Sequence, residues 1–327
     1  MKSKLVDQYG RQIKYLRFSV TDRCDLRCKY CLPKGFKEFS EPENSLNFDE
    51  IEHLVALFAQ MGVEHLRITG GEPLVRKGIE HLIASLASIP GISDLSLSTN
   101  AVRLEKFAEK LKRAGLQRIN VSLDTLCENQ YAELTCGKLT KVLNGLEAAR
   151  KVELSPIKIN CVLMKNVNED EVERILEYCA QRDFTLRLIE PMPIGKTGRS
   201  VQAQYLSLDS VKRKLQKRYN LLPDVMPGAG PARYYRLDGS STRIGFITPI
   251  SQHFCETCNR VRLSCEGDIY TCLGDETRYP LGSYLRRGCP DNELIEHIFR
   301  AVNLKPEKHD FLSSQKRIVR FMSMTGG

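Results

Sequence analysis

Six short stretches rich in β-forming residues constrain the fold of this chain more than any other feature of its sequence. Helical patterns lie between them: Asn47 followed by Glu50 predicts a capped helix start, and an i, i+3, i+4, i+7 apolar stripe runs from Leu104 to Leu111. Strands that alternate with helices favour a parallel sheet, either doubly wound and open or curved into an incomplete barrel. The six stretches span residues 15–20, 64–69, 93–99, 117–123, 157–163 and 184–190.

Candidate ligand-binding residues come directly after these stretches, at the points where parallel sheets bind their ligands. A cysteine-rich loop comes after the first stretch, and Gly70-Gly71-Glu72-Pro73 after the second. We therefore expect one binding site along the carboxyl ends of the strands. Later candidates at the same edge are Asn100, Ser122, Asp124, Glu190 and Met192.

The pattern changes in the last third of the chain. A helix is expected near 207–220, followed by a Pro- and Gly-rich linker at 227–231, short strands, and helices near 281–304. We place the domain boundary in the linker. The sequence therefore predicts a strand-and-helix domain at 1–230 and a C-terminal domain at 231–327.

The charge balance indicates an anionic partner. The 327 residues include 49 Lys and Arg against 40 Asp and Glu, a net charge of +9. The basic residues occur singly or in pairs inside ordered-looking segments, and no basic tail is evident. This distribution favours a compact polyanion bound in a pocket over a nucleic acid.

Hydropathy and cysteine usage indicate the compartment. The longest apolar run, residues 54–59, is far shorter than the roughly 20 residues of a membrane span. The N-terminus carries charges where a signal peptide is apolar. The 12 cysteines form two tight clusters and scattered singles, which suits metal binding in a reducing compartment. We expect a cytoplasmic protein without a membrane segment.

The first cysteine cluster has three thiols and no histidine nearby. Cys24, Cys28 and Cys31 are spaced Cys-x3-Cys-x2-Cys. A structural zinc site and an electron-transfer cubane each use four protein ligands, so three thiolates on a cubane leave one iron open. The alternative is a metal site that only holds the loop together.

The second cluster is Cys255-x2-Cys258-x13-Cys272, with Cys265 in between. Four thiols at this spacing also suit a structural zinc site. Strand alternation after Cys258 places Arg260 and Arg262 on one face and Cys265 on the other. This parity argues that Cys265 stays outside the site.

The run from Thr21 to Cys31 (TDRCDLRCKYC), followed by the glycine turn at 70–73, closely resembles the radical S-adenosylmethionine (SAM) superfamily. The resemblance implies an α/β fold with an incomplete (β/α)6 TIM-like barrel at 1–230. It also implies a [4Fe–4S] cluster on the first three cysteines, with SAM bound at the open iron. The implied SAM contacts are Tyr30, Gly71, Ser122 and Met192.

The second motif, CETCNRVR at 255–262 with Cys272, resembles the GTP cyclase family of molybdenum cofactor biosynthesis over essentially the whole chain. That family carries a second [4Fe–4S] cluster, here implied on Cys255, Cys258 and Cys272, whose open iron binds guanine. Its C-terminal Gly-Gly reaches the active site, which implies catalytic roles for Arg17, Gly326 and Gly327. The implied GTP contacts are Arg17, Arg67, Ser98, Lys158, Arg260, Val261 and Arg262.

The resemblance also implies a reaction and partners. GTP would become (8S)-3',8-cyclo-7,8-dihydroguanosine 5'-triphosphate in a lyase reaction, the first step of the pathway. An external one-electron donor, a homodimer and transfer of the product to cyclic pyranopterin monophosphate synthase are implied as well. The sequence departs from the usual pattern at Cys265, at Ser98-Thr99-Asn100-Ala101 and at Pro191. The alternatives are a radical peptide-modifying enzyme with an auxiliary cluster and, more remotely, a zinc protein that binds nucleic acid.

Overall fold

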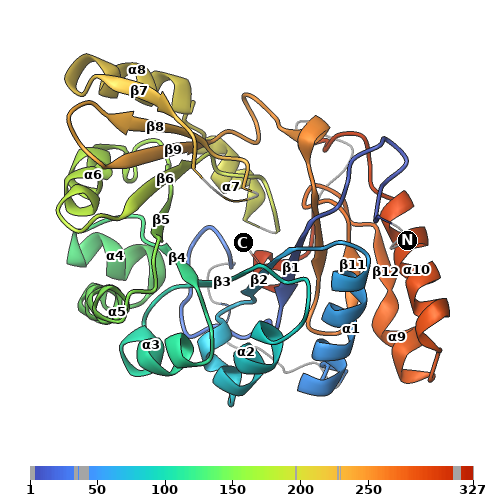
Figure 1. Cartoon of the computed structure of the whole chain (residues 1–327). Helices are drawn as coiled ribbons and strands as arrows, with labels where there is room; N and C mark the ends of the chain where they lie inside the picture. Colours follow the sequence, from blue (N-terminus) through green and yellow to red (C-terminus); the bar gives the residue numbers. More distant parts are fainter. Residues whose placement is uncertain are drawn as a thin grey trace.

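The computed structural model describes residues 4–32, 36, 44–195, 197–226, 228, 230–311 and 318–326. Its central feature is a 12-stranded sheet with the strand order β12-β11-β10-β1-β2-β3-β4-β5-β6-β9-β8-β7. The sheet curls into an open arc with helices along its outer side (Figure 1).

Six central strands lie parallel and in chain order, and each matches a predicted stretch to within one residue at either end. The curl of the sheet confirms the incomplete (β/α)6 barrel and excludes the flat doubly wound sheet. The strands are β1 (Tyr15–Ser19), β2 (His65–Thr69), β3 (Asp94–Thr99), β4 (Arg118–Ser122), β5 (Ile157–Val162) and β6 (Thr185–Ile189). The connecting helices are α1 (Phe48–Gln60), η1 (Pro73–Val75), α2 (Ile79–Ala87), α3 (Leu104–Arg113), α4 (Glu128–Thr135), α5 (Leu139–Lys151), η2 (Glu169–Glu171) and α6 (Val172–Ala180).

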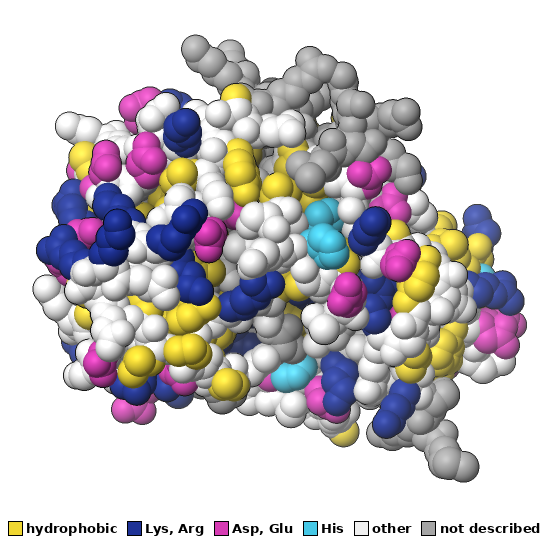
Figure 2. All heavy atoms as spheres, turned by 90° about the horizontal axis from the view of Figure 1, so that it is seen from above, with side chains coloured by type: hydrophobic (Ala, Val, Ile, Leu, Met, Phe, Trp, Pro, Cys, Tyr) yellow, Lys and Arg dark blue, Asp and Glu magenta, His cyan; other side chains and the backbone are white. Residues whose placement is uncertain are grey.

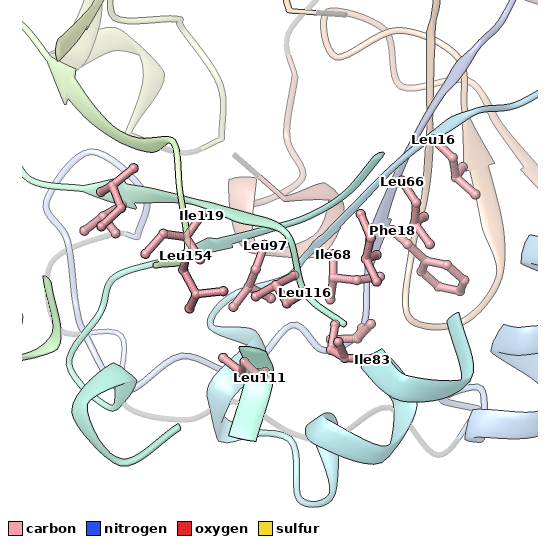
Figure 3. Close-up of a cluster of buried hydrophobic side chains, with 14 of the residues drawn as sticks. Leu16, Phe18, Leu66, Ile68, Ile83, Leu97, Leu111, Leu116, Ile119 and Leu154 are labelled. Atoms are coloured by element: carbon pink, nitrogen blue, oxygen red, sulfur yellow. The ribbon is translucent and has the colours of Figure 1, made fainter. Parts of the chain in front are cut away.

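Side chains of the central strands alternate between an apolar outer face and a polar inner face. Leu16 and Phe18 of β1 are fully buried on the outer face, as are Leu66 and Ile68 of β2. Figure 3 shows these side chains in one buried layer with Ile83 of α2. Because the outer face supplies the core, the residues between them face inward and remain available for a ligand.

The start of α1 has the predicted capping arrangement. The Asn47 side chain accepts a hydrogen bond from the Glu50 backbone N–H at 2.8 Å, and the Glu50 carboxylate accepts one from the Asn47 N–H at 2.7 Å. These two bonds satisfy N–H groups that have no partner within the helix. Ile51 then begins the buried stripe of this helix.

The C-terminal third extends the sheet at both edges. β9 pairs in parallel with β6, and β10 pairs in parallel with β1. The predicted boundary at residue 230 falls in the connection between β7 and β8, which pair with each other, and the division into two domains stays a prediction. The elements are α7 (Gly198–Ala203), α8 (Leu208–Arg218), β7 (Leu221–Asp224), β8 (Arg233–Leu237), β9 (Arg243–Ile247), η3 (Cys255–Thr257), β10 (Arg260–Leu263), β11 (Asp268–Tyr270), β12 (Arg278–Pro280), α9 (Leu281–Arg286), α10 (Asp291–Asn303) and α11 (Met322–Thr325).

The helices in the described part of the chain include none with the length and apolar character needed to cross a lipid bilayer.

Candidate active site on the inner face of the half-barrel

A cavity at the carboxyl ends of the central strands brings the first cysteine cluster together with all the residues predicted to bind SAM. It is also lined by Ser98, which the sequence assigned to the other ligand, and by Met322 of the C-terminal segment. The predicted residues in its lining are Cys24, Cys28, Tyr30, Cys31, Gly71, Ser122 and Met192.

The three thiols of this cavity belong to half-buried residues and lie close to one another. Burial raises the pKa of Cys24 and of Cys31 to about 12, and it raises the pKa of Cys28 strongly. The negative charges of Cys31 and Cys24 would oppose ionisation of Cys28 further. A bound metal deprotonates such thiols outright, so this donor set fits an iron–sulfur cluster.

The glycine turn after β2 packs directly on the cysteine loop. The Gly71 N–H donates to Thr21 O at 2.7 Å, and the Glu72 N–H donates to Arg23 O at 2.7 Å. A Cβ atom added at Gly71 would lie 2.3 Å from Arg23 O. Only glycine therefore allows the two segments to approach this closely.

Two buried carboxylates form hydrogen bonds with residues that line the cavity. Glu72 accepts hydrogen bonds from the Thr99 hydroxyl at 2.8 Å and the Asn100 N–H at 2.6 Å, and burial raises its pKa to about 7. Asp124 accepts from the Tyr30 hydroxyl at 2.7 Å, and burial raises its pKa to about 6. The sequence placed both carboxylates at strand ends but did not assign them these positioning roles.

The middle of the inner face carries adjacent cations on neighbouring strands. Arg17 is paired in register with Arg67 on one side and Arg262 on the other. Burial and these two neighbours hold the pKa of Arg17 well below its ordinary value. Burial also lowers the pKa of Arg67 to about 10 and that of Arg262 to about 9. Such buried and mutually repelling cations would be stabilised by a bound polyanion.

A second cavity continues from these cations towards the amino ends of the strands. Its lining includes Arg67 and Lys158, both predicted, and Arg118 and Arg187, which were not. Tyr234 of β8 forms part of the opposite wall. Strand parity would have found the two missed arginines, because Arg118 and Arg187 occupy inward-facing positions of β4 and β6.

The space-filling view looks down onto the open side of the half-barrel (Figure 2). Lys and Arg side chains gather near its central hollow and over the α8 and β7–β9 side. This face therefore combines the inward-facing cations with further positive charge on α8, whose sequence reads LDSVKRKLQKR. The distribution agrees with the anionic partner expected from the net charge.

The second set of three thiols lies beside the amino end of β1. The Tyr15 N–H donates to Asn259 O, next to Cys258, at 3.1 Å. Cys272 is close enough to Cys255 and Cys258 for their charges to affect its pKa. Burial tends to raise the pKa of Cys258, but nearby Lys305 and Arg260 lower it to about 7.

Cys265 lies away from this set. Its thiol is buried, and the groups that affect its pKa are Asp22, Glu266, Ser45 and Arg76, with no thiol of the second set among these described residues. The backbone N–H of Leu46 donates to Cys265 O at 2.7 Å. This arrangement agrees with the parity argument that left Cys265 outside the second site.

Neither cysteine cluster has the arrangement of a single-ion site. In the ranges that the structure describes, no three His, Cys, Asp or Glu side chains converge as the ligands of one metal ion would. A cubane does not require such convergence, because its thiolates bind different iron atoms.

The C-terminal segment lies against the inner face of β1 and β2. Arg262 donates to Thr325 O at 3.1 Å and also to Gly326 O. A Cβ atom added at Gly326, which has φ +69°, would lie 2.1 Å from the Thr69 methyl carbon. Gly327, also predicted to be catalytic, lies outside the described residues.

Two other predicted substrate residues of β10 differ in orientation. Arg260 is two residues before Arg262 on the strand and therefore also points to the inner face. Its guanidinium lies 5.1 Å from the centre of the Phe254 ring. The Val261 side chain is instead fully buried in the core on the outer face. At Val261 only the backbone is available to a ligand on the inner face.

Two family models match adjacent parts of the chain. The model described as "Radical SAM superfamily" matches residues 18–179, and "Molybdenum Cofactor Synthesis C" matches residues 184–311. The crystal structure of Streptococcus suis SuiB bound to S-adenosylmethionine is similar in fold, with TM-score 0.63 at 13% identity, over 91% of this chain and 69% of that one. This likeness confirms the radical SAM fold.

Curated relatives match over nearly the full length. The GTP 3',8-cyclase of Nitrobacter winogradskyi is 44% identical over 99% of this chain and 96% of its own length. That of Heliobacterium modesticaldum is 42% identical over 99% of this chain and 100% of its own. Together with the two family models and the curled sheet, these matches show that the chain belongs to the GTP 3',8-cyclase family of the radical SAM superfamily.

Proposed function

We propose that the chain converts GTP to (8S)-3',8-cyclo-7,8-dihydroguanosine 5'-triphosphate, a lyase reaction of molybdenum cofactor biosynthesis. One observation carries the proposal. Two three-thiol sets lie at opposite ends of β1, and the cations Arg17, Arg67 and Arg262 lie on the inner face between them. A nucleoside triphosphate fits this arrangement because it offers a base to one end and a polyanion to the middle.

The first three-thiol cavity is proposed to bind SAM and one [4Fe–4S] cluster, held by Cys24, Cys28 and Cys31. When bound, this pair supplies the hydrogen-abstracting radical of the superfamily. Gly71, Ser122 and Met192 would shape the SAM pocket. Tyr30 contributes a fixed backbone, since its hydroxyl donates to Asp124 and its carbonyl accepts from Thr197 at 2.9 Å.

The second three-thiol set is proposed to hold another [4Fe–4S] cluster through Cys255, Cys258 and Cys272. Its open iron would orient guanine. Arg260 is well situated to contact the nucleotide there, because it begins β10 directly beside this set. Val261 would take part through its backbone.

The triphosphate is proposed to lie along the cations between the clusters. Arg17, Arg67, Lys158 and Arg262 would bind it, with Ser98 towards the first cavity. The lining of the second cavity adds Arg118 and Arg187 to this set. Arginine suits the task because its planar fork binds two phosphate oxygens at once.

The C-terminal glycines are proposed to complete the active site. Gly326 packs against Thr69, and its carbonyl accepts from Arg262, the register partner of Arg17. A side chain here would displace the tail. Gly327, the next residue of the sequence, is proposed to share this catalytic role.

The remaining expectations concern partners and organisation. We propose a homodimer, an external one-electron donor and transfer of the product to cyclic pyranopterin monophosphate synthase. We also retain the barrel domain at 1–230, the C-terminal domain at 231–327 and a cytoplasmic location as proposals.

The decisive experiment begins with purification of the chain without oxygen. Two four-iron clusters predict about eight irons per chain. Addition of SAM, reductant and GTP should yield 5'-deoxyadenosine and the cyclised nucleotide. Zinc in place of iron, or deoxyadenosine formation that does not depend on GTP, would contradict the proposal.

Matched cysteine variants sharpen this test. Cys258→Ser should reduce the iron count to about four, because one cluster loses a ligand. Cys265→Ser should retain about eight, because Cys265 lies away from the other thiols. Equal losses in the two variants would place Cys265 among the cluster ligands.

A further inference from the structure

The second three-thiol set is bordered by a buried lysine that the proposed reaction does not use. Lys305 is 2% exposed, and its ammonium donates to Arg260 O at 2.8 Å and to Thr271 O at 2.5 Å. It also lies close enough to the Cys258 thiol for its charge to lower the pKa of that thiol. Lys305 therefore ties the segment just after Cys258 to the residue directly before Cys272.

Two buried arginines hold the outer parts of the same site. Arg11 donates to Cys255 O at 2.9 Å, and Arg320 donates to Cys272 O at 3.3 Å. Each has a carboxylate partner: Asp7 lies 2.6 Å from Arg11, and Glu276 lies 3.2 Å from Arg320. Their positive charges are thus largely balanced within the protein.

Lys305 differs from these arginines in its partners. Its hydrogen-bond acceptors are backbone carbonyls, the Cys258 thiol is nearby, and it forms no ion pair with any residue that the structure describes. Arg260 and Arg262 add further positive charge near Cys258. The second set of thiols therefore lies in a positive environment.

The first set of thiols lies among buried carboxylates, and one half-buried cation, Arg27, donates to Cys24 O at 2.9 Å. Asp124 is 3% exposed and close to Cys28 and Cys31, while Glu72 is 1% exposed and close to Cys24. The Asn100 amide lies 3.8 Å from the Cys24 sulfur and donates to the Asp25 carboxylate at 2.8 Å. Arg103 forms an ion pair with Asp25 at 2.9 Å and so balances its charge. Asp124 instead accepts hydrogen bonds from neutral donors, and the described residues provide no ion-pair partner for it.

Reduction adds one negative charge to an iron–sulfur cluster. Nearby cations favour the reduced state and nearby carboxylates oppose it, most strongly where both are buried. We propose that this chain gives its two clusters different reduction potentials, with the second cluster the easier to reduce. Lys305 is the positioning residue whose charge raises the potential of the second cluster. The inference rests on the proposed function in one respect, namely that both thiol sets hold clusters.

The test measures potentials rather than turnover. The Cys24→Ala/Cys28→Ala/Cys31→Ala chain should retain the second cluster, and the Cys255→Ala/Cys258→Ala/Cys272→Ala chain the first. Each is titrated with mediators and followed by electron paramagnetic resonance, without SAM or GTP. The second cluster should be half reduced at the higher potential. Equal potentials or the reverse order would overturn the inference.

The Lys305 variants identify the residue responsible. Lys305→Met should lower the equilibrium constant for reducing the second cluster roughly tenfold, about 59 mV for one electron. Lys305→Arg keeps the positive charge, so the reduction potential of the second cluster should remain near that of the parent. Lys308→Met removes an exposed charge close by in the sequence and should change the reduction potential of neither cluster. An unchanged second potential in Lys305→Met would remove Lys305 from its assigned role.

Two further outcomes are distinguishable. If Lys305→Met fails to assemble its second cluster, the order of the two potentials in the cysteine variants still decides the inference. If the unmodified chain itself binds only about four irons, the proposed two-cluster function fails, and with it the premise of the comparison.

Discussion

Protonation of Lys158, on the inner face of the half-barrel, makes the stability of the fold depend on pH. Burial, together with Arg187 and Arg118, lowers the pKa of this lysine to about 7. In an unfolded chain a lysine has a pKa of about 10.4, so the unfolded state binds more protons between these values. Lys158 therefore destabilises the fold at neutral and lower pH, and this cost disappears as the pH rises towards about 10.

Lys158→Met should remove this pH dependence. Its free energy of unfolding at pH 7 should exceed that of the parent by more than about 1 kcal/mol, and the difference should shrink by pH 9.5. Denaturant unfolding at the two pH values measures both quantities. Lys217→Met, an exposed lysine of α8, serves as the control and should leave the difference near zero. An equal change in the free energy of unfolding in both variants would contradict the lowered pKa of Lys158.

The sequence identified many of the single residues in the candidate site, since Tyr30, Gly71, Ser122, Met192 and the three cysteines of the first cluster all line the first cavity. It missed Arg118 and Arg187. Each alone looks like an ordinary strand charge. Strand alternation places both arginines on the inner face, but only the curl of the sheet brings them into one cavity with Arg67 and Lys158.

At the level of elements, the cap of α1 offers a test independent of any ligand. Asn47→Ala removes the side-chain acceptor for the Glu50 N–H and should lower the free energy of unfolding by about 1 kcal/mol. Asn47→Asp keeps the acceptor and should cost little. Iron content and nucleotide binding should be unchanged in both, because this cap lies outside the candidate site. Equal stability of Asn47→Ala and the parent would show that the capping box contributes nothing.

The C-terminal segment offers a test of the catalytic tail. Gly326→Ala places a Cβ atom 2.1 Å from the Thr69 methyl carbon at a φ of +69°, so the tail must move and Arg262 loses its carbonyl acceptors. We expect the rate of GTP-dependent 5'-deoxyadenosine formation to fall at least about tenfold. The iron content should remain that of the parent.

A control substitution at a second glycine of similar φ distinguishes displacement of the tail from backbone strain as the cause of lost activity. Gly239 has a similar φ of +70° in the connection between β8 and β9, but a Cβ atom added there meets nothing within 4 Å. Gly239→Ala should lose some stability and keep the parent rate. If both alanine variants lose activity equally, strain alone explains the result and the tail has no special role.

For the whole molecule, the buried cations predict a strong response to polyanions. Inorganic triphosphate should raise the melting temperature of the protein, because it relieves repulsion among Arg17, Arg67, Lys158 and Arg262. At one hundred times its dissociation constant, a single-site ligand adds about 2.7 kcal/mol. Thermal unfolding monitored by circular dichroism measures the shift.

Potassium chloride at the same ionic strength is the control for screening, and it should give a much smaller shift. Lys158→Met should reduce the shift caused by triphosphate, because it removes one phosphate contact. Equal shifts from the two salts would mean that the inner face holds no triphosphate site.

By itself the sequence determined the strands, the face each residue occupies and the carboxyl-end location of the first thiol set. These features depend on local spacing, since a period of two fixes strand faces and a motif directly after a strand must lie at the carboxyl end of that strand. Its motifs also indicated the family. Only the tertiary structure decided that the sheet curls, that Arg118 and Arg187 share one cavity with Lys158, and that Lys305 lies near Cys258. These arrangements join segments far apart in the chain, and their contacts depend on how the two edges of the sheet are extended and packed.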